Sequence, residues 1–206
     1  LACVDRPVKK FFYFLPCLDE YVNEFDLEQF DLIVIVDAGA SYMTDFHIKY
    51  PNLFKSKVPI LNIDHHASND RFGKVNIVET DSASTTVIIY KMLKEWGAFI
   101  DEEMATCLLA GIYNDTGSFM HSNTDGQVYE ISGDLMNKGA KVAEISQALF
   151  RTKSVSTLKL WGRVLENVYL TDENVVMSVV KESDYDSAGA NPEQLTGVID
   201  YLNMVP

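Results

Sequence analysis

Acidic and imidazole side chains gather at three places in this sequence: Asp37, the tripeptide Asp64-His65-His66, and Asp115. Carboxylate oxygens and imidazole nitrogens are ligands for Mn²⁺, Mg²⁺ or Zn²⁺, and mixed oxygen and nitrogen ligation without sulfur favours Mn²⁺. Asp37 and Asp115 also have structural explanations, because aspartate is common in turns and at helix N-caps. For these two residues the sequence leaves both a metal site and ordinary turn chemistry open.

The tripeptide Asp64-His65-His66 is harder to explain by packing. It holds two of the four histidines in the chain and follows a short apolar run. Because neighbouring side chains on an extended chain point to opposite faces, one histidine could face a metal and the other a substrate. His47 lies in a polar helical stretch and is interpreted as a surface residue. We therefore expect the functional site at residues 64–66.

The surrounding elements predict an α/β domain in which helices cover a mainly parallel sheet. Residues 32–36 are a β-branched run typical of a strand buried on both faces, and residues 58–63 form a second strand. Ligands of open α/β sheets bind beyond the carboxyl ends of the strands, where Asp37 and Asp64 stand. Apolar periodicity predicts helices over residues 82–96, 102–113, 127–138 and 142–150.

The last third of the chain has a different character. The pattern predicts a helix at 154–168, a strand at 175–180, a polar loop at 185–192 and a helix at 193–202. One strand and one helix are too little for an independent domain, so this part is interpreted as the truncated start of a second α/β domain. We therefore predict a first α/β domain at 1–153, a connector helix at 154–170 and the start of a second domain at 171–206.

Composition narrows the classes of partner. The chain of 206 residues has a formal net charge of -13, and an acidic surface argues against binding of long nucleic acid. A small phosphorylated substrate is still compatible if bound cations neutralise the site. Three scattered cysteines do not suggest a disulfide framework, and no apolar run reaches membrane-span length. These features predict a cytoplasmic location without a membrane partner, and they leave a homodimer open.

Together the motifs resemble the DHH phosphoesterase superfamily. Val36-Asp37-Ala38-Gly39 is similar to its second motif, Asp64-His65-His66 to the motif that names it, and residues 115–119 (Asp-Thr-Gly-Ser-Phe) to the fourth. Within the superfamily the chain is most similar to the NrnA-type DHH/DHHA1 proteins, which are nano-RNA phosphodiesterases and 3′-phosphoadenosine 5′-phosphate phosphatases. Three flanking segments indicate this subgroup: residues 64–69, 82–86 and 122–124.

The resemblance assigns roles to these residues. It implies two Mn²⁺ ions, with Mg²⁺ or another divalent ion as the alternative, and Asp37 as the ligand that bridges them. His65 and Asp115 would complete one metal site, His66 would contact the substrate phosphate, and Asp64 would orient a histidine. Further candidates for polar or phosphate contacts are His121, Asn123, Arg151 and Lys153, and a solvated helix end explains the last two equally well.

The implied function is hydrolysis of short oligoribonucleotides or nucleoside bisphosphates by a water that two metals activate. A cyclic-dinucleotide phosphodiesterase and a non-catalytic nucleotide-binding regulatory protein are the alternatives. The family's first motif and most of its second domain, DHHA1, have no counterpart in these 206 residues. We therefore expect this stretch of chain to be inactive by itself.

Overall fold

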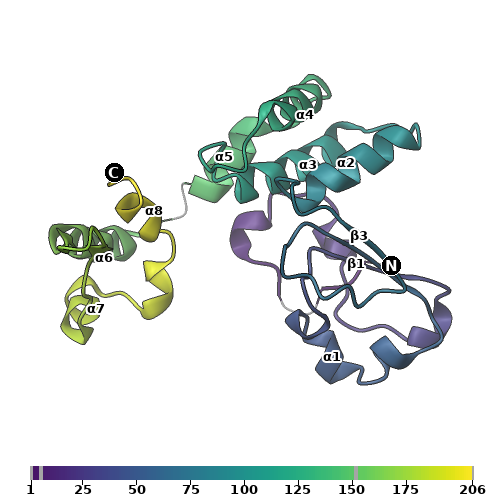
Figure 1. The fold of residues 1–206 in the computed structure, drawn as a ribbon, viewed down its shortest axis with the longest axis horizontal. Coiled ribbons are helices and arrows are strands. Elements are labelled where there is room, and N and C mark those ends of the chain that lie inside the picture. Colours follow the sequence, from purple (N-terminus) through teal and green to yellow (C-terminus); the bar gives the residue numbers. More distant parts are fainter. Residues whose placement is uncertain (1, 5–6, 151–152, 206) are drawn as a thin grey trace. The chain divides into compact units, whose positions relative to one another are not determined.

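The computed structural model describes residues 2–4, 7–150 and 153–205, and it divides into two units. The first is Leu1–Leu149 and the second is Phe150–Pro206, and each is described by itself (Figure 1). This division places the predicted connector helix within the second unit. The family identity of the predicted domains and their limits stay predictions.

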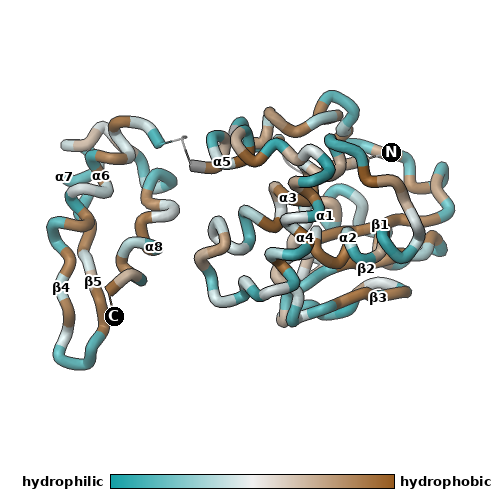
Figure 2. The backbone as a smooth tube through the Cα atoms, turned by 90° about the horizontal axis from the view of Figure 1, so that it is seen from above, coloured by the Kyte–Doolittle hydropathy of each residue, from teal (hydrophilic) through white to brown (hydrophobic). Residues whose placement is uncertain are grey.

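A three-stranded parallel sheet lies in the first unit. It contains β1 (Ile33–Val36), β2 (Ile60–Asp64) and β3 (Val75–Val78) in the order β1-β2-β3, and Figure 2 shows the strands side by side. The sequence predicted the first two strands but missed β3, whose four residues include a polar asparagine. Together with the helices described next, the sheet confirms the predicted α/β fold class.

The prediction that residues 32–36 are buried on both faces is wrong. Val34 and Val36, which point to the same face of β1, are each 49% exposed. Strand β1 pairs with β2 alone in the described sheet, whereas β2 lies between two strands and contacts helix α2. A β-branched run therefore identified a strand correctly but overestimated its burial, because burial depends on what covers the sheet.

Four helices pack together above this sheet in Figure 1: α2 (Thr85–Glu95), α3 (Glu102–Asp115), α4 (Gly126–Asn137) and α5 (Val142–Phe150). They match the predicted helices closely. The side chains of Ser84, Asp101 and Asp125 accept hydrogen bonds from backbone N–H groups in the first turns of α2, α3 and α4. These caps explain where the three helices begin.

The apolar faces of these four helices form the main core. Val87 of α2, Leu109 and Ile112 of α3, Leu135 of α4 and Ile145 of α5 are all at most 1% exposed. Burying such a side chain contributes about 1.5–3 kcal/mol each, so this core fixes the helices that border the sheet. The positions of the helices in turn determine where the polar residues at their ends lie.

The remaining elements of the first unit are short. They are the helix α1 (Phe46–Lys49) and five 3₁₀ helices: η1 (Lys10–Phe12), η2 (Leu18–Glu20), η3 (Leu27–Gln29), η4 (Ser41–Met43) and η5 (Leu53–Lys55). Among the described residues, no helix combines the length and apolar character needed to cross a membrane.

The second unit contains α6 (Val155–Glu166), a hairpin of β4 (Tyr169–Leu170) and β5 (Val176–Met177), α7 (Glu182–Ala188), η6 (Pro192–Leu195) and α8 (Ile199–Leu202). Its small core consists of Trp161, Val164 and Val198, with Val180 and Leu195 packed against them. Figure 2 shows the two strands of the hairpin running side by side. Helix α6 agrees with the helix predicted at 154–168.

Two predictions in this unit are wrong. The predicted polar loop at 185–192 contains most of α7, because Asp184 accepts a hydrogen bond from the Lys181 N–H at 2.9 Å and so caps a polar helix. The predicted helix at 193–202 is divided into η6 and α8, because Gly197 between them has a φ of 94°. A left-handed glycine interrupts helical hydrogen bonding despite a helical sequence pattern on either side.

Candidate metal centre

The ends of two neighbouring strands bring the predicted site residues together. Asp37 follows β1, and its N–H donates to the Ile63 carbonyl of β2 at 3.0 Å. Asp64 is the last residue of β2, with His65 and His66 directly after it. Because β1 and β2 are parallel, these residues share one edge of the sheet. Asp37 has a φ of 58°, a left-handed conformation that is uncommon outside glycine and often found at functional sites.

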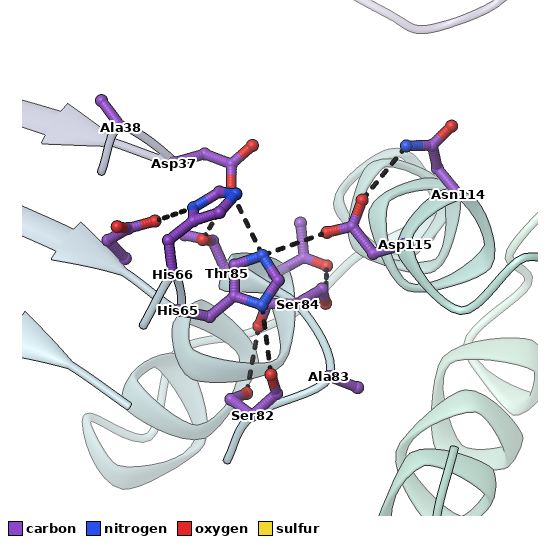
Figure 3. A network of polar contacts seen from close by, with 12 residues as sticks. Asp37, Ala38, His65, His66, Ser82, Ala83, Ser84, Thr85, Asn114 and Asp115 are labelled. Atoms are coloured by element: carbon purple, nitrogen blue, oxygen red, sulfur yellow. Dashed lines mark hydrogen bonds and ion pairs between the residues drawn. The ribbon is translucent and has the colours of Figure 1, made fainter. Parts of the chain in front are cut away.

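His65 lies between two carboxylates in this site. Its Nε2 is 3.8 Å from Asp37 Oδ1 and 3.7 Å from Asp115 Oδ2, as Figure 3 shows. Ligand atoms of Asp37, His65 and His66 also lie within 4.8 Å of one another. The structure therefore brings together Asp37, His65 and Asp115, the three predicted metal ligands, and adds His66 to the cluster. We refer to these four residues as the strand-end cluster.

The hydrogen bond at the other ring nitrogen of His65 determines what Nε2 can do. Nδ1 is 3.1 Å from the Ser82 carbonyl oxygen, which can only accept, so Nδ1 carries the proton. In the neutral imidazole, the lone pair of Nε2 then points towards Asp37 and Asp115. Two carboxylates around a nitrogen lone pair repel one another unless a cation lies between them. This donor set fits a divalent cation of the Mn²⁺ or Mg²⁺ type.

Asp115 reaches the site from the C-terminal end of α3. Its Oδ1 accepts from Asn114 Nδ2 at 3.1 Å, which leaves Oδ2 to face His65. Burial, followed by the nearby charge of Asp37, raises the pKa of the Asp115 carboxyl despite that hydrogen bond. The negative end of the helix dipole also disfavours an anion here. A cation at this position would relieve both costs.

His66 is held by a buried carboxylate. Its Nδ1 donates to Asp64 Oδ1 at 2.7 Å, and Asn69 Nδ2 donates to Asp64 Oδ2 at 2.6 Å. Burial of Asp64 opposes ionisation, but the hydrogen bonds from Asn69 and His66 outweigh it and lower the pKa of the carboxyl. The same hydrogen bond raises the pKa of His66. His66 is thus held through Nδ1, and its ring belongs to the strand-end cluster.

Strand alternation predicted that the two histidines point to opposite sides, but in the structure they do not. Their ring centroids are 4.6 Å apart, and both rings belong to the strand-end cluster. Strand β2 ends at Asp64, so the regular alternation of side chains no longer applies at His65 and His66.

The candidate substrate contacts have different surroundings. His121 Nδ1 is 3.3 Å from the Asp115 carbonyl oxygen, and Asn123 Nδ2 donates to the carbonyls of Asp115 and Ala83 at 3.2 and 3.1 Å. Both side chains therefore support the loop after α3. Arg151 lies outside the described residues. Lys153 belongs to the second unit, where its Nζ lies 4.9 Å from the centre of the Trp161 ring.

Sequence reasoning assigned no role to three residues that hold the site. Ser82 accepts from His65, Asn69 donates to Asp64, and the Thr85 hydroxyl donates to Asp37 Oδ1 at 2.8 Å. Residues 69 and 82–86 belong to the segments that indicated the subgroup, but serine, threonine and asparagine carry no chemical signal by type or spacing. Their contacts become visible only in three dimensions.

With this geometry established, the chain can be placed among known proteins. Residues 4–112, more than half of the chain, match the family model described as the DHH family, N-terminal domain. The chain therefore belongs to the DHH family, as its motifs indicated.

Individual relatives indicate a subgroup within this family. The bifunctional oligoribonuclease and PAP phosphatase NrnA of Thermus thermophilus is 31% identical over 145 residues, covering 69% of this chain and 44% of that protein. The protein of the same name from Bacillus subtilis is 27% identical over 195 residues, covering 93% and 60%. The chain thus spans about half the length of these curated relatives. Their similarity confirms the predicted resemblance to NrnA-type proteins.

A solved structure supports the fold over nearly the whole chain. An exopolyphosphatase-related protein from Bacteroides fragilis superposes with a TM-score of 0.86 at 22% identity, covering 98% of this chain and 62% of that one. At this identity the likeness establishes the fold alone, and the chemistry must be argued from the residues of the site.

Proposed function

We propose that the protein containing this chain is a metal-dependent phosphoesterase. The observation that carries the proposal is the position of His65 Nε2, 3.8 Å from one carboxylate and 3.7 Å from another at the carboxyl ends of parallel strands. Membership of the DHH family supports the same conclusion. The intact carboxylate and imidazole donors favour an enzyme over a regulatory binding protein.

In this proposal Asp37, His65 and Asp115 bind the cation, with Mn²⁺ as the expected ion. When bound, divalent cations neutralise phosphate charge and make a nearby water more acidic. His66 donates from Nε2 to a phosphate oxygen, and Asp64 holds that ring in place through Nδ1. The family motif would also make Asp37 a ligand shared by two cations.

The proposed substrates are short oligoribonucleotides and the nucleoside bisphosphate PAP. Two relatives carry both activities in their names, and the net charge of -13 argues against long nucleic acid. A cytoplasmic location, a homodimer and a DHHA1 identity for the second unit stay predictions.

The test is a hydrolysis assay on the protein containing this chain, with a short oligoribonucleotide and with PAP. We expect Mn²⁺-dependent turnover that chelation removes and that Asp37→Asn abolishes. Asp31→Asn is the matched control, because Asp31 is an exposed aspartate before the opposite end of β1. Turnover that persists in chelator, or in Asp37→Asn, would overturn the proposal.

A further inference from the structure

The Asp37 carboxylate needs an orienting partner. Its side chain is 55% exposed, so burial alone does not fix its rotamer. The backbone of Asp37 is held by the bond to Ile63, but that bond leaves the carboxylate free to turn. A side-chain hydrogen bond from the Thr85 hydroxyl to Oδ1, at 2.8 Å, restrains this carboxylate (Figure 3).

The hydroxyl of Thr85 has a different partner from those of the buried threonines in and directly after α3. The hydroxyls of Thr106 in α3 and of Thr116 directly after it donate to carbonyls of that helix, to Glu102 and Ile112, both at 2.7 Å. Thr85 is the first residue of α2, and no earlier turn of that helix offers it such a carbonyl. Its hydroxyl is therefore available for Asp37, and at 4% exposure its own position is fixed by packing.

The same short segment contacts the other ligands of the cluster. The Ser82 carbonyl accepts from His65 Nδ1 at 3.1 Å and so directs Nε2 towards the carboxylates. The Ala83 carbonyl accepts at 3.1 Å from Asn123, which also donates to the Asp115 carbonyl. Residues 82–85 thus touch Asp37 and His65 directly and Asp115 through one side chain. Such outer contacts orient metal ligands and raise affinity by reducing reorganisation.

We propose that Thr85 is a positioning residue for the metal centre, which sets the Asp37 carboxylate through its hydroxyl before a cation binds. The inference rests on the proposed cation site. The hydroxyl hydrogen engages one lone pair of Oδ1, so Oδ2 and the second lone pair of Oδ1 remain for cations. Thr85 therefore determines which oxygens Asp37 offers.

The test compares three substitutions by calorimetric titration of Mn²⁺ into metal-free protein. Thr85→Val keeps the shape and removes the hydroxyl, and we expect Mn²⁺ affinity to fall by ~10–100-fold, the usual loss for an outer ligand contact. Thr85→Ser restores the donor and is expected to bind nearly as wild type does. Thr86→Val is the matched control, because the Thr86 hydroxyl bonds Ser84 and no residue of the cluster.

The unfolding midpoint of each variant separates positioning from structural damage. Since Asp37 is half exposed, loss of its partner leaves no buried unpaired carboxylate, and we expect Thr85→Val to unfold near the wild-type midpoint. Wild-type Mn²⁺ affinity in Thr85→Val, or an equal loss in Thr85→Ser, would overturn the role of Thr85 alone. Absence of Mn²⁺ binding by the wild-type protein would overturn both this inference and the proposed function.

Discussion

The strand-end cluster and a second polar cluster, around Gln194, both gather side chains from distant parts of the chain. In the second unit, Gln194 Nε2 lies 3.0, 2.9 and 2.8 Å from the hydroxyls of Ser154, Ser156 and Thr157. Its Oε1 accepts from the Asn191 N–H at 2.8 Å. Every group in this cluster is neutral and is bonded within it.

The strand-end cluster has the opposite character. Asp37 and Asp115 are carboxylates that lie 3.8 and 3.7 Å from His65 Nε2, and among the described residues neither forms an ion pair with a lysine or an arginine. One cluster therefore completes its own hydrogen bonds and stabilises a helix start, while the other leaves negative charge for a cation. Uncompensated charge, rather than polarity or clustering, therefore distinguishes the candidate binding site from the structural network.

The largest effect should follow loss of the residue between the two carboxylates. His65→Ala removes a nitrogen ligand and leaves Asp37 and Asp115 to repel each other. We expect Mn²⁺ affinity to fall by more than the ~10–100-fold typical of an outer contact, and hydrolysis to fall to background. His47→Ala, which changes a histidine outside the cluster, should behave as wild type. Equal activity of the two variants would contradict the distinction.

Asp64→Ala should have the next largest effect. It removes the carboxylate that holds His66, and metal affinity is expected to fall by ~10–100-fold. It also removes the acceptor of His66 Nδ1 and one of the three acceptors of Asn69 Nδ2, which should cost about 1–3 kcal/mol of stability. Titration with Mn²⁺ and urea unfolding measure the two effects. Wild-type values in both experiments would show that Asp64 does not hold the His66 ring in place.

The Gln194 cluster should respond in stability alone. We expect Gln194→Ala to lower the unfolding free energy of the second unit by about 0.5–1.5 kcal/mol and to leave Mn²⁺ affinity unchanged. The fluorescence of Trp161, whose Nε1 donates to the Gln194 carbonyl at 2.8 Å, reports this unfolding in a Trp96→Phe background. Exposed Gln147→Ala is the control. A change in the Mn²⁺ affinity of Gln194→Ala would contradict a purely structural role for the Gln194 cluster.

The smallest effect concerns pH. The raised pKa of His66 means that its bond to Asp64 stabilises the metal-free protein fully below the unfolded histidine value of about 6.5. That contribution is lost as pH rises through the raised pKa. Because the side chain is 40% exposed, we expect less than about 1 kcal/mol. Urea midpoints of wild type and His66→Gln in chelator should converge as pH rises from 6 to 8.5, whereas divergence would contradict the sign.

Ionisation of Asp64 sets the lower pH limit of the stabilisation that the bond between His66 and Asp64 provides. Its lowered pKa means that the pair stabilises the fold above the unfolded aspartate value of about 3.9. This contribution is lost as pH falls through the lowered pKa. The bond between His66 and Asp64 is therefore most stabilising between these two limits.

Sequence predicted the parts of the fold that local pattern controls. The helices at 82–96, 102–113, 127–138 and 142–150 were anticipated because their apolar periodicity and capping residues agree with their packing. Strand β3 and helix α7 were missed because the first is short with a polar centre and the second is mostly polar. The prediction that β1 is buried on both faces was wrong because exposure of a strand face is a property of the whole sheet.

The candidate site was predictable in its charged members but not in the residues that hold them. Asp37 and His65 could be identified by type, position after strands and family motif, and Asp115 by type and family motif. Thr85 and Asn69 could not, because an isolated hydroxyl or amide has many ordinary uses on a protein surface. Their significance depends on distances between segments that lie far apart in sequence.

In the proposed site, Asp37 and Asp115 bind one divalent cation together with His65. Calorimetric titration of Mn²⁺ into metal-free wild type, Asp37→Asn, Asp115→Asn and the double variant tests it most directly. Ligands of one cation should be coupled, so we predict that each single variant loses most of the binding and that the two losses do not add in the double variant. Wild-type affinity in either single variant, or two independent and additive losses, would contradict a shared metal centre.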